Sequence, residues 1–549
     1  MRELRGWLLD LYEDARQGAV LWLVGEDGVR YRLHHPFEVT FYVAGPMEEL
    51  KALARFLSTR AKGLPLEYEQ RRDLFQARPL PVLAVRAPDP VTATRLFEDA
   101  AGRFPRLSYY DVDLPLDLRY AARYGTFPLA YCRVRAGDDG LVREIEPLES
   151  PWELDAEPAA LRTLSIEPDV DPAHAPPRSL LLSYGRSRLV LPLEPERLLV
   201  NLAAVLRHWD PDLVLTRWGD TWILPLLLRM AGERGLPLPL NREEGRGVAR
   251  RAERSYFSYG RIIHRGSQVR LFGRVHIDQE NGLLWDDCGL DGVFELARVT
   301  GLSLQTVART SPGSGISAME VLTALRQGVL VPWHKGQAEQ PKEALEMMRA
   351  DQGGLVYQPL LGLHFHVGEL DFSSMYPSLM ARHNISPEVL PGTEAPPGLI
   401  PQTLQPLLDK RLALKGRLGS LPAWDPRRKR EKARASALKW LLVTCFGYLG
   451  YKNARFGRIE AHEAVTAWGR ETLLQAKELA EEMGFTVLQL YVDGLWVQKE
   501  GAETPRDFQP LLEAIAERTD LSIALEGVYR WIAFLPSRED ERQPVPNRY

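Results

Sequence analysis

The sequence has few cysteines and no long apolar run. Only three cysteines, Cys132, Cys288 and Cys445, occur among 549 residues. This excludes a disulfide scaffold and a zinc knuckle built on cysteine, and it fits a reducing cytosol. Nowhere do 18 apolar residues follow one another, and the N-terminus has no apolar signal core, so neither a membrane span nor a membrane partner is expected. The sequence therefore predicts a cytoplasmic protein.

A global excess of positive charge is also lacking. The sequence has 69 Lys and Arg residues and 73 Asp and Glu residues, which gives a net charge of −4. No overall positive field therefore indicates a polyanionic partner. The exception is the segment 409–439, which contains eleven basic residues and only three acidic ones. A charge run of this kind is often only a solvated helix face. Here Arg411 and Lys415 share one helix face, and Lys439 follows on a second helix, so two antiparallel basic helices would suit a triphosphate or a nucleic-acid backbone.

The length and composition predict several globular domains. A chain of 549 residues with 45% hydrophobic and 26% charged residues is long enough for three or four domains with buried cores. In the first 155 residues, strands are predicted at 39–43 and 80–85 and a helix at 48–58, which indicates a mixed α+β domain. A helix is expected over 341–350, with its proline in the first turn, and the pair Gly353 and Gly354 ends it.

Three segments carry the chemistry. In 368–378, Asp371 ends a strand and a turn with Ser, Tyr and Pro leads into a helix. In 439–451, a helix that carries Lys439 ends in an aromatic stretch. In 487–497, an apolar hairpin carries a single carboxylate, Asp493, at an Asp-Gly turn. Each is a weak signal alone, since an aspartate at a strand end is most often a cap.

The order and spacing of these segments resemble the catalytic half of family B DNA polymerases. The first resembles motif A, with Met375 where the family has leucine, and the second resembles motif B, with Lys439 in place of its lysine. The third resembles motif C, while Arg411 and Lys415 match the fingers residues that meet the triphosphate. The resemblance covers about 353–549 and extends more faintly back to about 156.

The resemblance implies a DNA-templated DNA polymerase whose cofactor is a pair of Mg²⁺ ions, with Mn²⁺ as a substitute. In-line nucleotidyl transfer with two such ions suits two carboxylates plus substrate phosphates, here Asp371 and Asp493. The turn at Ser374, Met375 and Tyr376 is expected to hold the β- and γ-phosphates, with Tyr376 beneath the sugar excluding a ribose 2′-hydroxyl. The basic residues expected to neutralise the triphosphate and the leaving pyrophosphate are Arg411, Lys415 and Lys439.

The expected partners are primer-template DNA and dNTPs, with a processivity or accessory protein as a further candidate. The protein is then expected in the cytoplasm, associated with the nucleoid. The residues that the resemblance assigns to DNA contacts are Tyr448, Tyr451, Arg548 and Tyr549.

Motif C departs from the family pattern, which has two aspartates. A gapless register places Tyr491 at the first aspartate and Asp493 at the second, which keeps the minimal pair with Asp371. A shift by two residues would instead place Asp493 first and Leu495 second, which would cripple the site. The gapless register is favoured. Motif B also loses an amide and a phenol hydroxyl, because Val443 and Phe446 stand at those positions, which bears on speed and fidelity rather than on the type of reaction.

The upstream part resembles a proofreading exonuclease with degraded motifs. Its first motif appears at Glu167 and Asp169, and the metal-binding aspartate of the second is replaced by Ile223. No third motif is found, and the region 275–291 looks shortened. A two-metal nuclease cannot lose half its carboxylates and keep its rate, so proofreading is expected to be lost. Asp220 is the one candidate substitute for the missing aspartate.

The predicted fold is α+β and multidomain. It comprises an N-terminal mixed domain, an RNase H-like degenerate exonuclease domain, a palm with helical-hairpin fingers, and no thumb. The stretch 547–549 resembles the entry to a thumb, and either a thumb is supplied differently or the chain is truncated. The whole resembles a short, exonuclease-defective branch of the family found in archaea and some bacteria. The predicted boundaries are 1–155 (N-terminal), 156–345 (exonuclease-like), 346–403 (palm, first part), 404–446 (fingers) and 447–549 (palm, second part).

Three further features invite functional readings. His364 and His366, two apart on a strand, could bind a metal, but no third ligand is evident and a structural or surface role is favoured. The segment 311–315 is glycine- and serine-rich but lacks the ending of a phosphate loop, so a loop near DNA or a plain linker is expected. Trp218 and Trp222 could stack on single-stranded bases, although core packing is favoured.

Two functions remain from this reading. The first is a DNA polymerase without effective proofreading, used in repair or lesion bypass. The alternative is a catalytically inactive scaffold that binds primer-template DNA in replication or repair. The position of Asp493 relative to Asp371 distinguishes the polymerase from the inactive scaffold.

Overall fold

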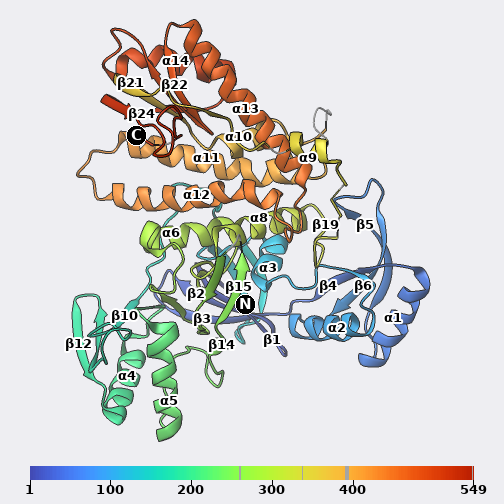
Figure 1. The fold of residues 1–549 in the computed structure, drawn as a ribbon. Coiled ribbons are helices and arrows are strands. Elements are labelled where there is room, and N and C mark those ends of the chain that lie inside the picture. Colours follow the sequence, from blue (N-terminus) through green and yellow to red (C-terminus); the bar gives the residue numbers. More distant parts are fainter. Residues whose placement is uncertain (259–260, 337, 340, 351, 390–394, 547) are drawn as a thin grey trace. The chain divides into compact units, whose positions relative to one another are not determined.

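A computed structural model describes residues 1–549 except 259–260, 337, 340, 351, 390–394 and 547. Two compact units form: Met1–Trp333 with Lys410–Leu441, and His334–Asp409 with Leu442–Tyr549. Both mix helices and strands (Figure 1), so the predicted α+β multidomain class is confirmed. No helix within the described ranges is long and apolar enough to cross a membrane.

The first unit begins with two five-stranded sheets, of strand orders β3-β2-β1-β8-β9 and β19-β5-β6-β4-β7. The strands of the first are β1 (Arg2–Asp14), β2 (Gly18–Gly25), β3 (Arg30–His35), β8 (Tyr131–Ala136) and β9 (Val142–Pro147). Those of the second are β4 (Val39–Ala44), β5 (Leu66–Asp73), β6 (Leu80–Ala87), β7 (Ser108–Tyr110) and β19 (Val329–Leu330). The accompanying helices are α1 (Met47–Arg60), α2 (Pro90–Arg103) and α3 (Leu116–Tyr124). The strands and the helix predicted in this region are therefore present.

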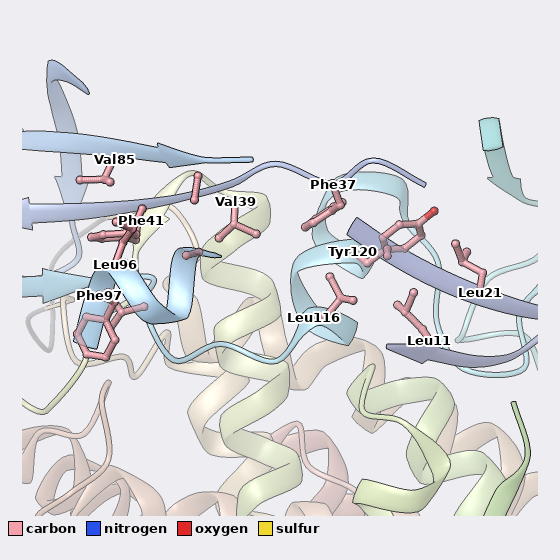
Figure 2. Packing of buried hydrophobic residues seen from close by; sticks show 14 of the residues in the cluster. Leu11, Leu21, Phe37, Val39, Phe41, Val85, Leu96, Phe97, Leu116 and Tyr120 are labelled. Carbon is pink, nitrogen blue, oxygen red and sulfur yellow. The ribbon is translucent and has the colours of Figure 1, made fainter. Parts of the chain in front are cut away.

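One hydrophobic core joins these two sheets. Figure 2 shows Phe41 of β4 and Phe97 of α2 in one part of it, and Leu11, Leu21 and Tyr120 in another. The rings of Phe41 and Phe97 meet edge to face, with centroids 6.5 Å apart. Alternating apolar residues along the strands and a three-to-four-residue apolar repeat along the helices supply this core.

A third five-stranded sheet of the first unit has the order β12-β11-β10-β13-β18, and its strands β10, β13 and β18 are parallel. Its strands are β10 (Thr163–Pro168), β11 (Ser179–Tyr184), β12 (Ser187–Pro192), β13 (Leu213–Thr216) and β18 (Val275–Asp278). The helices nearby in sequence are α4 (Pro195–Trp209), a π-helix (Gly219–Ile223) and α5 (Leu224–Arg234). Two small pairs complete this region: β14 (Ala249–Arg251) with β17 (Gln268–Arg270), and β15 (Arg254–Ser258) with β16 (Arg261–Arg265). Because β10, β13 and β18 are parallel, their carboxyl ends share one edge of the sheet.

Three helices follow this sheet: α6 (Trp285–Thr300), α7 (Leu304–Val307) and α8 (Pro312–Arg326). The loop predicted at 311–315 is wrong, because α8 begins there. The Ser311 hydroxyl accepts a hydrogen bond from the Ser314 N–H, and Pro312 occupies the first turn. Both are ordinary signals of a helix start, and the glycines Gly313 and Gly315 are buried in it.

The second unit contains a five-stranded sheet of order β20-β22-β23-β21-β24. Its strands are β20 (Val356–Tyr357), β21 (Gly362–Phe372), β22 (Thr486–Tyr491), β23 (Gly494–Gln498) and β24 (Ile523–Phe534), and its helices are α9 (Ala344–Ala350), α10 (Met375–Arg382), α13 (Ile459–Glu482) and α14 (Pro505–Thr519). Residues of α13 and α14 pack with Leu370, Leu495 and Val497 in a single core. The helix predicted over 341–350 begins only at Ala344, so its proline precedes it.

Two long helices contribute residues to both units. They are α11 (Leu399–Ser420) and α12 (Arg427–Leu449) (Figure 1). At the turn between them, the Arg428 guanidinium donates to the carbonyl oxygens of Leu418 and Leu421, at 2.6 and 3.0 Å. The two antiparallel basic helices predicted from the charge run are therefore present.

Candidate active site

Asp371 lies near the end of the long strand β21. Residues on one side of β21 enter the core, Leu370 and Phe372 being almost fully buried, whereas Asp371 between them is half-exposed. In the antiparallel pair of β21 and β23, Asp371 lies directly opposite Gly494. A Cβ at Gly494 would lie 3.6 Å from the Oδ1 atom of Asp371. The strand thus holds the Asp371 carboxylate beside the start of β23.

Asp493 lies in the two-residue loop that joins β22 to β23, where Tyr491 pairs with Gly494. Val492, the first residue of this loop, has a φ of 59°. That conformation is rare for a β-branched residue. Its N–H donates to the carbonyl oxygen of Leu355 at 2.8 Å, which helps to hold it. Strained backbone of this kind concentrates at functional sites.

Asp371 and Asp493 are joined through the backbone. The N–H of Phe372, the next residue after Asp371, donates to the carbonyl oxygen of Asp493 at 3.0 Å. Leu495, in contrast, pairs with Leu370, and both side chains are buried in the core. Leu495 is therefore not at the hairpin tip, and Asp493 is.

The carboxyl group of Asp493 is partly buried. Burial raises the pKa of the Asp493 carboxyl above its usual value, and a backbone hydrogen bond offsets this only in part. A bound cation would stabilise the carboxylate form. Within the described ranges no three His, Cys, Asp or Glu side chains gather as a metal site. Two carboxylates nevertheless fit magnesium, which commonly takes one or two carboxylates together with substrate phosphates.

The turn after β21 is built from Ser373 and Ser374. The Ser373 N–H donates to the carbonyl oxygen of Ser522 at 2.8 Å, which ties the turn to the start of β24. Ser374 caps α10 with a φ of 56°, a left-handed conformation that is uncommon outside glycine. Met375 follows and is buried in the core. The predicted phosphate turn is thus a rigid strand-to-helix junction.

The Tyr376 side chain packs against three other segments of the chain. Its ring lies 4.7 Å from that of Phe446, centroid to centroid. A Cβ at Gly469 of α13 would lie 2.6 Å from its Cε1 atom, and a Cβ at Gly354 would lie 3.1 Å from its hydroxyl oxygen. Only glycine therefore fits at Gly469 without displacing the ring. Phe446 in turn stacks on His462, with centroids 4.1 Å apart and ring planes at 19°.

The predicted triphosphate-binding residues belong to the first unit. Lys415 and Lys439 are exposed, while Arg411 is half-buried and burial lowers its pKa. The neighbouring Lys410 is buried instead, in an ion pair with Glu295 of α6. The structure brings Asp371, Asp493 and Tyr376 together in the second unit, and it describes the three basic residues in the first.

The four residues predicted to contact DNA lie in the second unit. The rings of Tyr448 and Tyr451 are 5.6 Å apart, and Arg548 donates to the carbonyl oxygen of Pro536 at 3.3 Å. Tyr549 is half-exposed and lies among three rings, with centroids 5.7 Å from Trp496, 6.1 Å from Tyr529 and 5.8 Å from Phe534. Asn547, in the same predicted stretch, lies outside the described residues.

Sequence reasoning missed the aromatic surroundings of Asp371. Trp496 pairs with Glu369, which lies two residues before Asp371. A Cβ at Gly494, the residue opposite Asp371, would lie 3.7 Å from the Trp496 ring. The Tyr529 hydroxyl donates to the Glu369 carboxylate at 2.5 Å. The alternation of Glu369 and Asp371 along β21 is the signal that would have placed Glu369 on the same face.

The upstream carboxylates do not form a metal cluster in the described part of the chain. Glu167 is near the carboxyl end of β10, and Asp169 is exposed and accepts hydrogen bonds from the Arg178 N–H and the Ser179 hydroxyl. Ile223 is fully buried in the core of this sheet. Ile223 thus serves packing, and the Asp169 carboxylate holds the start of β11.

Asp220 is committed to a buried ion pair. Its Oδ2 atom lies 2.7 Å from the Nε of Arg309, and both side chains are almost completely buried. Burial favours the neutral acid, but Arg309 and His276 outweigh it and hold the pKa of Asp220 below its usual value. Its other oxygen accepts from the Val269 N–H. Asp220, the one candidate substitute for the missing nuclease aspartate, is thus already engaged by Arg309 and by the Val269 N–H.

The carboxyl ends of β10, β13 and β18 also carry a carboxylate and an arginine that the sequence analysis did not single out. Asp278 ends β18, and burial raises its pKa to about 6. Arg217, just after β13, bonds to Glu280, and Glu167 and Asp171 add to the negative surroundings that raise its pKa. A fixed arginine thus supplies positive charge at the carboxyl ends of these strands.

The two histidines of β21 do not form a metal site. His364 bonds through Nε2 to the carbonyl oxygen of Leu360 at 2.8 Å. His366 has a φ of 52°, and its Nε2 lies 4.0 Å from Glu503. Trp222 packs against the core of the upstream sheet, as favoured in the sequence interpretation, and Trp218 caps the π-helix.

Comparison with known proteins adds independent findings. A family model described as DNA polymerase family B matches residues 316–395 and 393–496. DNA polymerase 2 of Saccharolobus solfataricus is 32% identical over 269 residues, which cover 47% of this chain and 40% of that protein. DNA polymerase 2 of Aeropyrum pernix is 24% identical over 629 residues, covering 97% of this chain and 76% of the relative.

A solved structure shares the fold. The family B DNA polymerase from the hyperthermophilic archaeon Pyrobaculum calidifontis matches with a TM-score of 0.72 and 24% identity, over 98% of this chain and 79% of its own. The chain thus spans less than half of the Saccharolobus relative and about three quarters of the other two proteins.

Proposed function

Because the chain belongs to the family B DNA polymerases, we propose that it adds deoxynucleotides to the 3′ end of a primer under the direction of a DNA template. The reaction is nucleotidyl transfer aided by two divalent ions. The observation that carries the proposal is the junction of Asp371 and Asp493, held by the hydrogen bond from the Phe372 N–H to the Asp493 carbonyl. Two metal-binding carboxylates on neighbouring strand ends are the minimum that this chemistry requires.

Asp371 and Asp493 hold the metal ions in this proposal, Mg²⁺ by preference and Mn²⁺ as a substitute. When bound, such ions stabilise the negative charge that develops at the transferred phosphate and on the leaving pyrophosphate. The residues of the chain supply the rest. The Ser374–Met375–Tyr376 junction positions the β- and γ-phosphates, and Arg411, Lys415 and Lys439 neutralise the triphosphate. In this proposal 404–446 act as fingers, and 346–403 with 447–549 act as the palm.

Tyr376 selects the sugar. Phe446 and Gly469 limit where its ring can lie, so the ring forms a fixed floor below the incoming nucleotide. A fixed ring leaves room for a deoxyribose and excludes the 2′-hydroxyl of a ribose. Selection by exclusion needs a wall that cannot move, and glycine at Gly469 allows the ring to pack that closely.

Proofreading is absent in the same proposal. Ile223 is buried at the position of a metal-binding aspartate, Asp220 is held by Arg309, and Arg217 carries a positive charge among the remaining acids. A nuclease that uses two metal ions needs carboxylates where these groups lie. A polymerase without proofreading, with altered motifs B and C, suits repair or lesion bypass. Tyr448, Tyr451, Arg548 and Tyr549 contact the primer-template, and an accessory protein would supply further grip.

The test is template-directed extension of a labelled primer in Mg²⁺ or Mn²⁺. Four templates that differ at the next base are each offered one dNTP at a time, to the full chain and to Asp493→Ala. We expect addition of the complementary nucleotide only, and its loss in Asp493→Ala. Absence of extension in both metals, with primer-template still bound at low salt, would replace the proposal with the inactive scaffold. Addition without regard to the template would also contradict it.

A further inference from the structure

An almost bare tryptophan occupies the tip of the α11–α12 hairpin. Trp424 is 82% exposed, the largest exposure among the described tryptophans. A large aromatic side chain left in water gains nothing from burial on folding. A single exposed ring is common on protein surfaces, so the groups around Trp424 decide whether it has a function. The tip is distinct from Arg411, Lys415 and Lys439, the residues assigned to the triphosphate.

The turn that carries Trp424 is braced. The Asp425 N–H donates to the carbonyl oxygen of Pro422 at 3.1 Å, and the Asp425 carboxylate accepts from the Arg427 N–H at 2.9 Å. Pro422 and Pro426 restrict the backbone on either side. Behind the turn, Arg428 is bonded to two carbonyl oxygens at the end of α11. The indole is therefore held outward by a rigid support.

Positive charge is concentrated beside this tip. The first turn of α12 contains Arg427, Arg428, Lys429 and Arg430 and no acid. The helix dipole disfavours cations at that end and favours anions, so this sequence lowers the stability of the helix while it prepares an anion site. The cost indicates a ligand with negative charge.

The acids nearby do not cancel this charge. Asp425 pairs with Arg427, and Glu431 is buried in a pair with Arg434. The exposed side chains of Lys429, Arg430 and Lys432 form no ion pair in the described part of the chain. Three exposed cations thus follow the exposed ring within eight residues, and among them Arg430 helps to lower the pKa of Asp155.

We infer that the tip of the α11–α12 hairpin binds single-stranded nucleic acid. Trp424 stacks on an unpaired base, and Lys429, Arg430 and Lys432 contact the phosphates around it. Exposed aromatic rings beside a basic surface are the means by which proteins hold single strands without regard to sequence. Duplex DNA does not offer an unstacked base, so it is the poorer ligand. If the proposed polymerase function holds, the unpaired template strand is the natural occupant, but the contact itself needs neither metal nor nucleotide.

The test is fluorescence anisotropy of labelled 20-nucleotide dT and U strands with the full chain, without metal or dNTP. We expect Trp424→Ala to weaken binding by about 5- to 50-fold, the loss of one stacked base, and Trp424→Phe to restore most of it. Tyr68→Ala, an exposed aromatic on β5, is the matched control and should bind as the wild type does. Melting curves of each variant verify the fold.

Charge is tested separately. The triple variant Lys429→Gln, Arg430→Gln, Lys432→Gln should lower the slope of log affinity against log salt by about 2, since each phosphate contact in a single strand contributes about 0.7. Lys51→Gln with Lys62→Gln, two exposed cations of the N-terminal region of which Lys51 pairs with Glu48, should leave the slope unchanged. Wild-type affinity in Trp424→Ala would overturn the inference, and so would equal weakening for a blunt duplex. If the wild type self-associates and Trp424→Ala does not, while both bind the single strands equally well, the tip is a protein contact instead. Because no step uses Asp371 or Asp493, a failed extension assay leaves this result readable.

Discussion

The N–H of Phe372 donates a hydrogen bond to the carbonyl oxygen of Asp493 across 3.0 Å, although 121 positions separate them in the chain. This bond joins the end of β21 to the tip of the β22–β23 hairpin, so that the carboxylates of Asp371 and Asp493 belong to adjoining backbone segments. Leu495, the other candidate for a place beside Asp371, is packed with Leu370 in the core. The proposed reaction and several predictions depend on this arrangement.

Substitution of Gly469 is expected to disturb sugar selection rather than folding. In Gly469→Ala the added methyl group would lie 2.6 Å from the Tyr376 ring, so the ring must move. A displacement near 1 Å at a reacting site can cost about 10²-fold. We expect a similar fall in kcat/KM for dNTPs and increased use of ribonucleotides, measured by single-nucleotide extension.

The matched control is Gly232→Ala in α5, where an added methyl group meets nothing within 4 Å. It should keep the sugar preference and gain up to about 1 kcal/mol of stability from helix propensity. If Gly469→Ala discriminates against ribonucleotides as the wild type does, Tyr376 does not form the proposed wall.

The part of the chain around the sheet β12-β11-β10-β13-β18 is expected to have no nuclease activity. Single-stranded DNA labelled at its 5′ end should not be shortened in Mg²⁺ or Mn²⁺. Asp220→Asn should leave Arg309 buried without its carboxylate, at a cost of about 3–5 kcal/mol of folding stability. Thermal melting measures that loss. Metal-dependent shortening that Asp220→Asn abolishes in a folded protein would show that Asp220 is a nuclease residue after all.

A buried ionic cluster ties the basic helices to α6. Glu295 pairs with both Lys410 and Arg434, and all three are almost completely buried. Burial lowers the pKa of Lys410 to about 8 despite the Glu295 carboxylate. Glu295→Gln leaves the buried Lys410 facing a neutral amide and leaves Arg434 with Glu431 as its remaining carboxylate. We expect a loss of about 3–5 kcal/mol in urea unfolding.

The control for this cluster is an exposed pair. Glu194→Gln removes the partner of Arg197, both side chains being more than half exposed, and should change stability by less than about 1 kcal/mol. A Glu295→Gln variant as stable as this control would mean that the cluster does not anchor the helices.

Glu320 is expected to make stability fall as pH rises. Burial raises its pKa to about 8, from 4.5 in the unfolded chain. Between these values the folded state binds more protons than the unfolded state, so the free energy of unfolding decreases with increasing pH. Glu320→Gln removes this dependence and should stabilise the protein by about 3 kcal/mol at pH 7.

The measurement is the difference in unfolding free energy between Glu320→Gln and the wild type, from pH 4 to pH 9. The difference should be small near pH 4 and grow up to about pH 8. A constant difference would mean that Glu320 keeps its ordinary pKa in the folded protein.

The sequence could predict the local parts of the site but not the contacts that complete it. Asp371 at a strand end and Asp493 in a two-residue turn follow from alternating apolar residues and an Asp-Gly signal, which act over a few residues. The packing of Gly469 on Tyr376 joins α13 to α10, and the Asp220–Arg309 pair joins residues 89 positions apart. Such pairings depend on the tertiary fold, which periodicity does not encode.

The error at 311–315 has a local cause. Glycine and serine next to proline usually indicate a loop, but a serine cap followed by proline is also a helix start. Gly315 lets a neighbouring side chain approach closely, since a Cβ there would lie 2.7 Å from Leu441. Tertiary packing therefore supports a helix where the sequence analysis expected a loop.

The most direct test of the account is single-turnover primer extension by Asp371→Asn, Asp493→Asn, the double variant and Glu369→Gln. Glu369 is the matched control, a carboxylate two residues before Asp371 on the same strand that is bonded to Tyr529. We predict that each aspartate variant loses at least about 10³-fold in rate and that the double variant is no worse than the singles, as expected for groups that act as one unit. Glu369→Gln should stay within about tenfold of the wild type. Retained extension in Asp493→Asn, or a loss in Glu369→Gln equal to that in Asp371→Asn, would contradict the assignment of Asp371 and Asp493 as the metal-binding pair.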